Sequence, residues 1–208
     1  MYMRDTSTTF RRNEHLHYKE MTTVYLKRLT TSDIKDILAQ KLKSGEIREN
    51  GTIEIQNAHF VCDKSYIVEG TSCDIDMTWY EENYHPLIEK GDQLTAVVSK
   101  LVDDPCSRQA VICLASPTDH LNESPGYICT IYVQLFLNGN KLKYIVNMRS
   151  NDVARFPVDY KWHEAIYSTV AQALADRLET PITCQHIEWN VGSLHIYEKD
   201  FHLLSNVD

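Results

Sequence analysis

Two β-rich runs separated by Asn138-Gly139 constrain the fold of this chain more than any other feature. The first run, 127–137, consists largely of β-branched and aromatic residues, and a second predicted strand, 141–148, follows directly. Asn-Gly between two such runs is typical of a tight β-hairpin, because both residues tolerate the positive φ angles of a type I′ turn. The sequence therefore predicts an antiparallel pair of strands near its centre.

Helical and strand patterns lie on both sides of this hairpin. Apolar residues at helical spacing predict three helices. The first of them has Ser32 as a suitable N-cap and Gly45 as a stop signal. These helices cover residues 33–44, 91–102 and 160–178. Further strands are predicted over residues 52–55 (extended by Phe60-Val61), 110–115 and 182–191. Because the order of elements is mixed and strands adjoin in the middle, we predict an α+β fold with a largely antiparallel or mixed sheet and flanking helices.

The length of 208 residues, 43% of them hydrophobic, is sufficient for one globular domain, which we place at residues 31–208. Residues 1–30 are polar and have little periodicity, so we expect an extension that is partly disordered or packed on the surface. There is no apolar run of membrane-spanning length and no secretory signal, which favours a cytoplasmic location without membrane attachment.

The net charge of −8 argues against direct binding of nucleic acid, because proteins that contact many phosphates are usually basic. A single nucleotide phosphate needs only two or three arginines, so a nucleotide ligand remains compatible with this charge. The six cysteines include no CxxC pair, and no histidine pair has zinc-finger spacing. We therefore expect no metal site and no disulfide framework.

Two longer strings carry a family resemblance. Residues 146–153 read VNMRSNDV and residues 189–197 read WNVGSLHIY. Both resemble the deoxycytidylate hydroxymethylases of T-even-type phages, and their RSxD and GxxHxY parts are similar to thymidylate synthases more widely. Shorter matching segments follow the same order over roughly 33–204. The resemblance implies a thymidylate synthase-like fold and transfer of a one-carbon unit from 5,10-methylenetetrahydrofolate to C5 of a cytidine nucleotide, dCMP or CMP, giving a 5-hydroxymethyl product.

The resemblance also implies a nucleophile. In this superfamily the catalytic cysteine stands twenty positions before the arginine of RSxD, which here selects Cys129. The C5 atom of a pyrimidine is a weak nucleophile, and addition of a thiolate to C6 moves electron density onto C5. The thiolate is the reactive form of cysteine, and Arg149 is the expected cationic neighbour. The alternative interpretation of Cys129 is a buried strand residue of purely structural importance.

Further residues are implied to bind the phosphate. Arg149 and Ser150 of the RSxD motif would contact it, and guanidinium groups suit the bidentate geometry of such a ligand. By resemblance, Arg108 reaches the phosphate from the partner subunit, which implies a homodimer, and Arg48 is a looser candidate for a further contact. Each arginine could instead be a solvated surface charge.

Sugar and base contacts are implied as well. His195 and Tyr197 stand two residues apart, so in a strand they share one face, and the family uses this pair to bind a sugar hydroxyl. Asp159 is the implied reader of the base and a participant in catalysis, because a carboxylate accepts from the amino group of cytosine whereas thymidylate synthases carry asparagine there. Asp159 could also, or instead, be the N-cap of the helix over 160–178. Ordinary core residues are the alternative for His195 and Tyr197.

The segments that would bind folate depart from the family pattern at several places. Asp152 and Trp79 are the implied folate contacts, Asp76 replaces the general acid/base glutamate of the family, and Tyr84 is what remains of a catalytic Asn-Tyr-Gly loop. Asp76 is one methylene shorter than glutamate, the segment between Trp79 and the second helix is shorter than in relatives, and the chain ends soon after Tyr197. Two alternatives therefore stay open: a methylating synthase of the thymidylate synthase type, and a nucleotide-binding homologue that lost folate chemistry.

Overall fold

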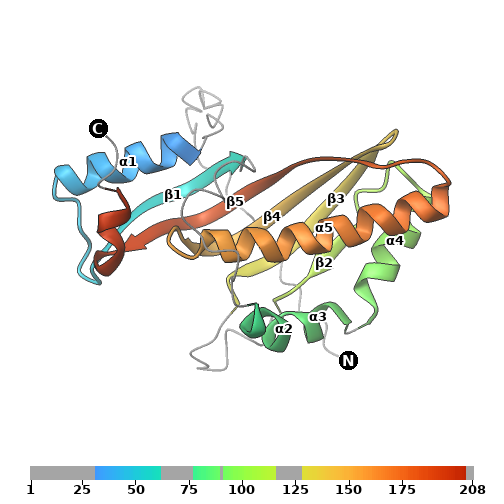
Figure 1. Cartoon of the computed structure of the whole chain (residues 1–208), viewed down its shortest axis with the longest axis horizontal. Coiled ribbons are helices and arrows are strands. Elements are labelled where there is room, and N and C mark those ends of the chain that lie inside the picture. The colour runs from blue at the N-terminus through green and yellow to red at the C-terminus, as the bar shows by residue number, and fades with distance from the viewer. Residues whose placement is uncertain (1–30, 62–76, 90, 116–127, 205–208) are drawn as a thin grey trace, which may run out of the picture.

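The computed structural model describes residues 31–61, 77–89, 91–115 and 128–204 (Figure 1). The expected extension over 1–30 and the candidate Asp76 lie outside these residues. The strands of the described part are β1 (Thr52–Val61), β2 (Val111–Cys113), β3 (Thr130–Asn138), β4 (Lys141–Asp152) and β5 (Thr183–Tyr197). The helices are α1 (Thr31–Lys43), α2 (Thr78–Asn83), α3 (His85–Glu89), α4 (Gln93–Asp103), α5 (Phe156–Leu178) and the 3-10 helix η3 (Glu198–Leu204).

All five strands form one sheet in the order β1-β5-β4-β3-β2. Strands β3 and β4 form the predicted hairpin, with Asn138 opposite Lys141 and Gly139 in the turn at φ 60°. The pairs β1/β5, β2/β3 and β3/β4 are antiparallel, and β4/β5 is parallel because α5 crosses over between them. The predicted α+β class with a mixed, largely antiparallel sheet is confirmed.

Helix α5 lies along one face of this sheet (Figure 1) and begins four residues before the predicted start. Pro157 occupies the first turn, where its missing N–H costs nothing. The N-cap position is consequently Arg155, and Asp159 lies inside the first turn. The interpretation of Asp159 as the N-cap was therefore wrong. Helices α2 and α3 were not predicted at all. The helices of the described residues are too short or too polar to span a bilayer.

The core lies between α5 and the sheet. On β4, Leu142, Tyr144 and Val146 alternate with partly exposed neighbours and have no exposed surface, as expected for a strand with one buried face. Trp189 of β5 packs against Phe156 of α5, with ring centroids 4.8 Å apart. This aromatic and aliphatic contact holds α5 against the parallel pair β4/β5.

A line of backbone irregularities crosses the sheet at one level. The β3/β4 register shifts at Ile131, Asn57 of β1 has a φ of 53°, and Gly192 of β5 lies opposite Arg149 of β4. A Cβ atom on Gly192 would stand 2.7 Å from the Arg149 carbonyl oxygen, so only glycine fits this close approach. Before this line the buried residues of β4 are the even-numbered ones, up to Met148. After it the alternation shifts by one position, and Asn151 is the next buried residue. Such irregularities re-aim side chains at the end of a sheet.

Candidate active site

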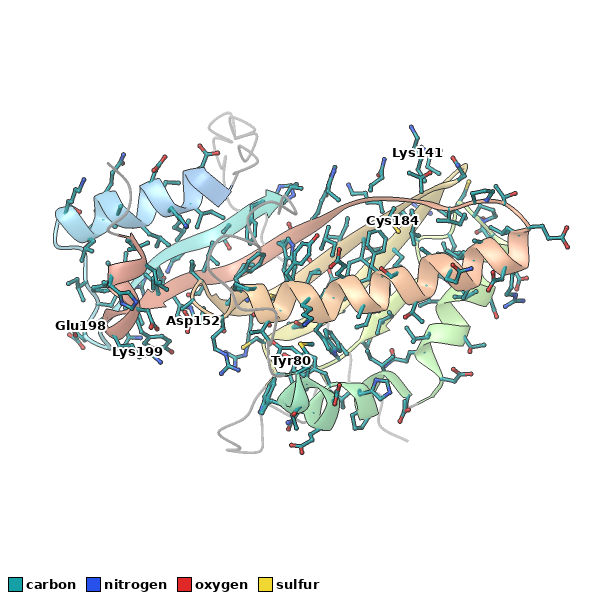
Figure 2. All side chains as sticks on the ribbon, viewed as in Figure 1. Tyr80, Lys141, Asp152, Cys184, Glu198 and Lys199 are labelled. Carbon is teal, nitrogen blue, oxygen red and sulfur yellow. The ribbon has the colours of Figure 1, made fainter. Side chains whose placement is uncertain are left out.

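The topology brings four segments to one end of the molecule. The carboxyl ends of β4 and β5 coincide because these strands are parallel, and Asp152 lies opposite His195. The hairpin returns the start of β3 to the same edge, and α5 begins there directly after β4. Asp152 and Lys199 lie at this end and Lys141 and Cys184 at the other (Figure 2). A pocket of about 460 Å³ opens at this edge.

Thirteen residues line this pocket, and nine of them are candidates from the sequence. The nine are Trp79, Tyr84, Cys129, Arg149, Ser150, Asp152, Asp159, His195 and Tyr197. Sequence reasoning did not select the remaining four as site residues, namely Tyr80, Asn151, Arg155 and Lys199. A single cavity therefore contains a thiol, several cations, two carboxylates and a set of aromatic rings.

The spacing of twenty residues between Cys129 and Arg149 has a geometric basis in the hairpin. Counted from the turn, a regular ladder would set Thr130 opposite Arg149, but the irregularity at Ile131 shifts the register by one residue. The Arg149 N–H donates to the Cys129 carbonyl oxygen at 2.9 Å, so these two residues lie side by side at the end of the hairpin.

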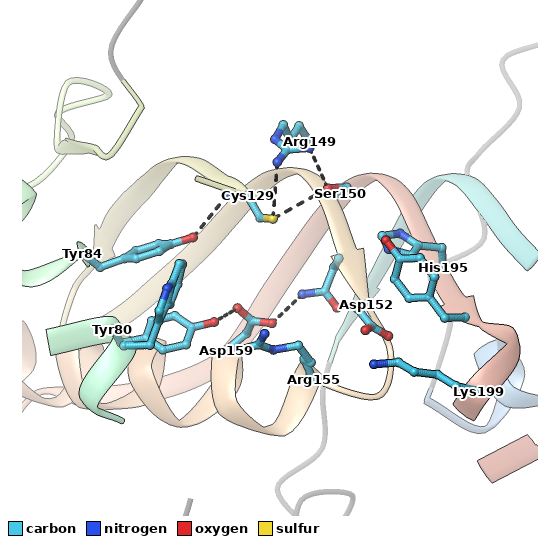
Figure 3. Close-up of a pocket in the computed structure, with 13 residues that line it drawn as sticks. Tyr80, Tyr84, Cys129, Arg149, Ser150, Asp152, Arg155, Asp159, His195 and Lys199 are labelled. Carbon is cyan, nitrogen blue, oxygen red and sulfur yellow. Dashed lines mark hydrogen bonds between the residues drawn. The ribbon is translucent and has the colours of Figure 1, made fainter. Parts of the chain in front are cut away.

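The thiol of Cys129 lies among polar groups at the pocket wall (Figure 3). Its Sγ atom is 3.8 Å from Arg149 Nη2 and 3.7 Å from Ser150 Oγ. The Cys129 N–H donates to the Tyr84 hydroxyl at 3.2 Å. Burial of Tyr84 is the main cause that raises its pKa to about 12, and the electrostatic effect of Cys129 is the second. A cation and a hydroxyl facing sulfur are the surroundings that stabilise a thiolate.

Asp159 is the most buried carboxylate of the pocket, with 6% of its surface exposed. Tyr80 donates a short hydrogen bond to Oδ1, and Asn151 Nδ2 donates to Oδ2 at 2.8 Å (Figure 3). Burial raises the pKa of Asp159 from 3.8 to about 6, and these two hydrogen bonds and the charge of Arg155 oppose that rise. The carboxyl group is therefore poised to gain or lose a proton near neutral pH.

Aromatic rings form one wall of the pocket. Tyr80 and Tyr84 of the α2–α3 segment pack on Trp162 of α5, with centroid separations of 5.6 and 4.8 Å. Trp79 packs on both tyrosines and remains 41% exposed at the mouth. On the opposite side, Tyr197 is also 41% exposed. The entrance therefore offers two exposed aromatic rings.

His195 and Tyr197 project from the same face of β5, as their spacing predicts, and their rings meet edge to face at 5.2 Å. The His195 Nδ1 atom lies 3.3 Å from the Ser193 carbonyl oxygen. On the neighbouring strand, Asp152 Oδ1 accepts from the Ala154 N–H at 3.0 Å. This end of the pocket therefore combines hydrogen-bonding groups with an aromatic surface.

Two candidate arginines lie elsewhere within this single chain. Arg48 forms an ion pair with Glu54 at 2.5 Å and lines a separate recess beside β1. Arg108 lines a recess after α4, next to Lys100 and Asp103. Neither arginine contributes to the wall of the pocket that holds Cys129. No cluster of three or more metal-ligating side chains occurs among the described residues.

A thymidylate synthase family model matches residues 63–207, which is most of the chain, and the chain therefore belongs to the thymidylate synthase family. The deoxycytidylate 5-hydroxymethyltransferases of Enterobacteria phages T4, T2 and T6 are each 30% identical to it over 134 residues. That match covers 62% of this chain and 52% of each relative, so the chain spans about half the length of these curated relatives. The thermostable thymidylate synthase A from Bacillus subtilis aligns over 54% of this chain and 38% of its own, with a TM-score of 0.47 and 24% identity.

Proposed function

We propose that this protein is a transferase that moves a one-carbon unit from 5,10-methylenetetrahydrofolate to C5 of a cytidine nucleotide and hydrates it, forming 5-hydroxymethyl-dCMP from dCMP. CMP is the second candidate substrate. The observation that carries the proposal is the position of Cys129 Sγ, within 3.8 Å of Arg149 in a pocket that also contains the buried carboxylate Asp159. The phage relatives, which are named for this reaction, support it.

In this proposal the Cys129 thiolate forms a bond to C6 of the pyrimidine. The π electrons of the C5–C6 bond move toward C5, which becomes nucleophilic enough to attack carbon. C5 would then bond to the one-carbon unit, the C5 proton would be lost as tetrahydrofolate leaves, and addition of water to the exocyclic carbon would expel the sulfur from C6 and restore the aromatic ring. Arg149 and Ser150 face the sulfur and stabilise its anionic form before attack, and Arg149 also binds the nucleotide phosphate. Tyr84 positions the Cys129 backbone through its hydroxyl.

Asp159 supports cytosine as the base. Its carboxylate accepts from an exocyclic amino group, and a carboxyl with a pKa of about 6 can also share a proton with the unprotonated N3 of cytosine. A proton at N3 withdraws electrons from the ring and favours attack at C6. His195 and Tyr197, on the other side of the pocket, are proposed to bind the sugar hydroxyl.

The groups at the mouth fit a folate. A pterin is flat, aromatic and rich in N–H donors, and Trp79 offers an exposed ring while Asp152 offers a carboxylate. Bound there, methylenetetrahydrofolate supplies a carbon at the oxidation level of formaldehyde. Asp76 remains the proposed general acid/base and organiser of water, on the basis of the family resemblance alone.

The position of Arg108 supports a homodimer. Arg108 lies outside the pocket of its own chain, so we propose that it contacts the phosphate in the partner's pocket. Mixing inactive Cys129→Ala protein with inactive Arg108→Ala protein should restore up to about a quarter of wild-type activity, because half of the subunits form mixed dimers and each contains one intact site. Absence of any recovery, with dimers present, would contradict a shared site. The assignment of Arg48 stays a prediction, since Arg48 is paired with Glu54.

Release of tritium from C5-labelled dCMP in the presence of methylenetetrahydrofolate tests the reaction. The proposal expects tritium release together with a hydroxymethyl product, whereas formation of dihydrofolate would indicate a methylating synthase. Nucleotide binding without release would indicate a binding protein. Cys129→Ala should abolish release, and Cys113→Ala, which removes an exposed thiol on β2, is the matched control. Turnover that survives in Cys129→Ala would exclude this nucleophile.

A further inference from the structure

Asn151 presents an unusual pattern of hydrogen bonds for a buried amide. Only 2% of its surface is exposed, and it forms part of the pocket wall. Its Nδ2 atom donates to Asp159 Oδ2 at 2.8 Å and lies 3.5 Å from Met148 Sδ. No donor among the described residues reaches its Oδ1 atom. Both donor positions of the amide are thus occupied, while its acceptor is unused.

The orientation of this amide follows from Asp159. A carboxylate only accepts, and the Tyr80 hydroxyl already donates to its other oxygen. Turning the Asn151 amide over would set its oxygen against a carboxylate oxygen, two acceptors without a hydrogen between them. The unpaired Oδ1 is therefore a consequence of the ionised Asp159. The orientation of an asparagine amide is often ambiguous, but here the carboxylate requires the Nδ2 atom to face it.

We propose that Asn151 is a second base-reading residue, whose side-chain carbonyl accepts one N–H of the exocyclic amino group of cytosine while Asp159 accepts the other. This inference rests on the proposed function, because it requires a cytidine nucleotide in the pocket. An exocyclic amino group has two hydrogens, and Asp159 and Asn151, which both line the pocket, each carry an acceptor. The Asn151 Oδ1 atom is itself buried, so the amide must turn toward the ligand to accept from it. A buried carbonyl without a partner is unfavourable, so a ligand that donates to it gains affinity.

The same pair rejects uracil. The O4 atom of uracil is an acceptor and would face two further acceptors, with no hydrogen between O4 and either of them. Discrimination in the pocket therefore comes from the amide as well as from the carboxylate. Asn151 is a specificity residue in this account, and it takes no part in the chemistry at C5 and C6.

Calorimetric titration of the full chain without folate tests this inference directly. The wild type should bind N4-methyl-dCMP, which retains one amino hydrogen, at least about tenfold more weakly than dCMP, because one hydrogen bond is lost and a methyl group meets the carbonyl. Asn151→Ala should weaken dCMP binding roughly three- to tenfold and narrow the gap between dCMP and N4-methyl-dCMP. Asn151→Ser, which keeps a donor for Asp159 but lacks the carbonyl, should act in the same direction.

The matched control is Asn147→Ala, because Asn147 lies on the same strand outside the pocket and bonds to Asn190 at 3.1 Å. It should leave every affinity ratio unchanged. Equal binding of dCMP and N4-methyl-dCMP by the wild type, which requires no variant to fold, would overturn the inference while leaving the proposed function intact. An unchanged gap in folded Asn151→Ala would do the same. Failure of the wild type to bind any of these nucleotides would instead overturn the proposed function, and this inference with it.

Discussion

Replacement of Asp159 by asparagine is expected to stabilise the protein at neutral pH. The carboxylate is 6% exposed, and burial raises its pKa from 3.8 to about 6, so the native state binds a proton more tightly than the unfolded chain does. The stability contributed by this group is greatest below pH 3.8 and is lost as the pH rises through about 6. Above that range the whole cost of a buried charge is present.

The size of this cost follows from the separation of the two pKa values. At about 1.36 kcal/mol for each of roughly two pH units, the ionised Asp159 lowers the free energy of unfolding by about 3 kcal/mol. Asparagine removes the charge and keeps an acceptor for Tyr80. It also supplies an N–H that the orphan Oδ1 of Asn151 can accept once its amide turns over. The substitution therefore resolves two unfavourable features at once.

Urea unfolding at pH 5 and pH 8 measures the effect. Asp159→Asn should raise the free energy of unfolding by about 3 kcal/mol at pH 8 and by roughly half of that at pH 5. Asp176→Asn, which changes an exposed aspartate on the same helix, is the control and should show no such pH dependence. A variant less stable than wild type at pH 8, or a gain equal at both pH values, would refute the reasoning about the buried charge. The preference for dCMP over dUMP should fall in the same variant.

Three further substitutions have defined outcomes. Gly192→Ala forces a Cβ atom to 2.7 Å from the Arg149 carbonyl oxygen and should cost roughly 1–3 kcal/mol by urea unfolding, with loss of nucleotide binding; wild-type stability would show that β5 can move away. Tyr84→Phe removes the acceptor of the Cys129 N–H and should lower kcat about tenfold or more without a comparable change in KM; an equal change in KM would assign Tyr84 to binding. His163 is fully buried, and burial lowers its pKa from 6.5 to about 3. As the pH falls, the unfolded chain therefore takes up a proton at this residue before the native protein does, which lowers the stability of the wild type. His163→Gln lacks this proton uptake and should lose less stability than wild type between pH 6.5 and 4.5.

The hairpin explains why the sequence predicted part of the pocket. Asn138-Gly139 determines the turn, and the turn determines which residues of β3 and β4 meet. A spacing of twenty residues between Cys129 and Arg149 then corresponds to side-by-side positions after a one-residue irregularity at Ile131. Turn chemistry alone would set Thr130 opposite Arg149, so the placement of the Cys129 thiol beside the guanidinium group depended on the family spacing as well.

Other parts depend on contacts that no local pattern encodes. Tyr80 and Asp159 are 79 residues apart and meet only because α2 packs on α5. Helices of five and six residues, such as α3 and α2, contain too few apolar positions to show a period. Arg48 was a candidate by resemblance, and its ion pair with Glu54, six residues further along the chain, was not predicted. The predicted helix begins at residue 160 because Asp159 is a suitable N-cap, whereas α5 begins at Phe156 with Pro157 in its first turn.

Two unfavourable features of this protein lie in the pocket. The buried carboxylate of Asp159 and the amide oxygen of Asn151, which has no partner among the described residues, both belong to side chains that line the pocket. The core between α5 and β4/β5, filled by side chains such as Tyr144 and Val146, offsets these costs away from the site. Asparagine in place of Asp159 would remove both features, so a structural role alone would prefer it. A site that must present acceptors and an anion to a ligand is therefore expected to contain such features. Substitutions that remove them should raise the stability of the protein and lower its base selectivity.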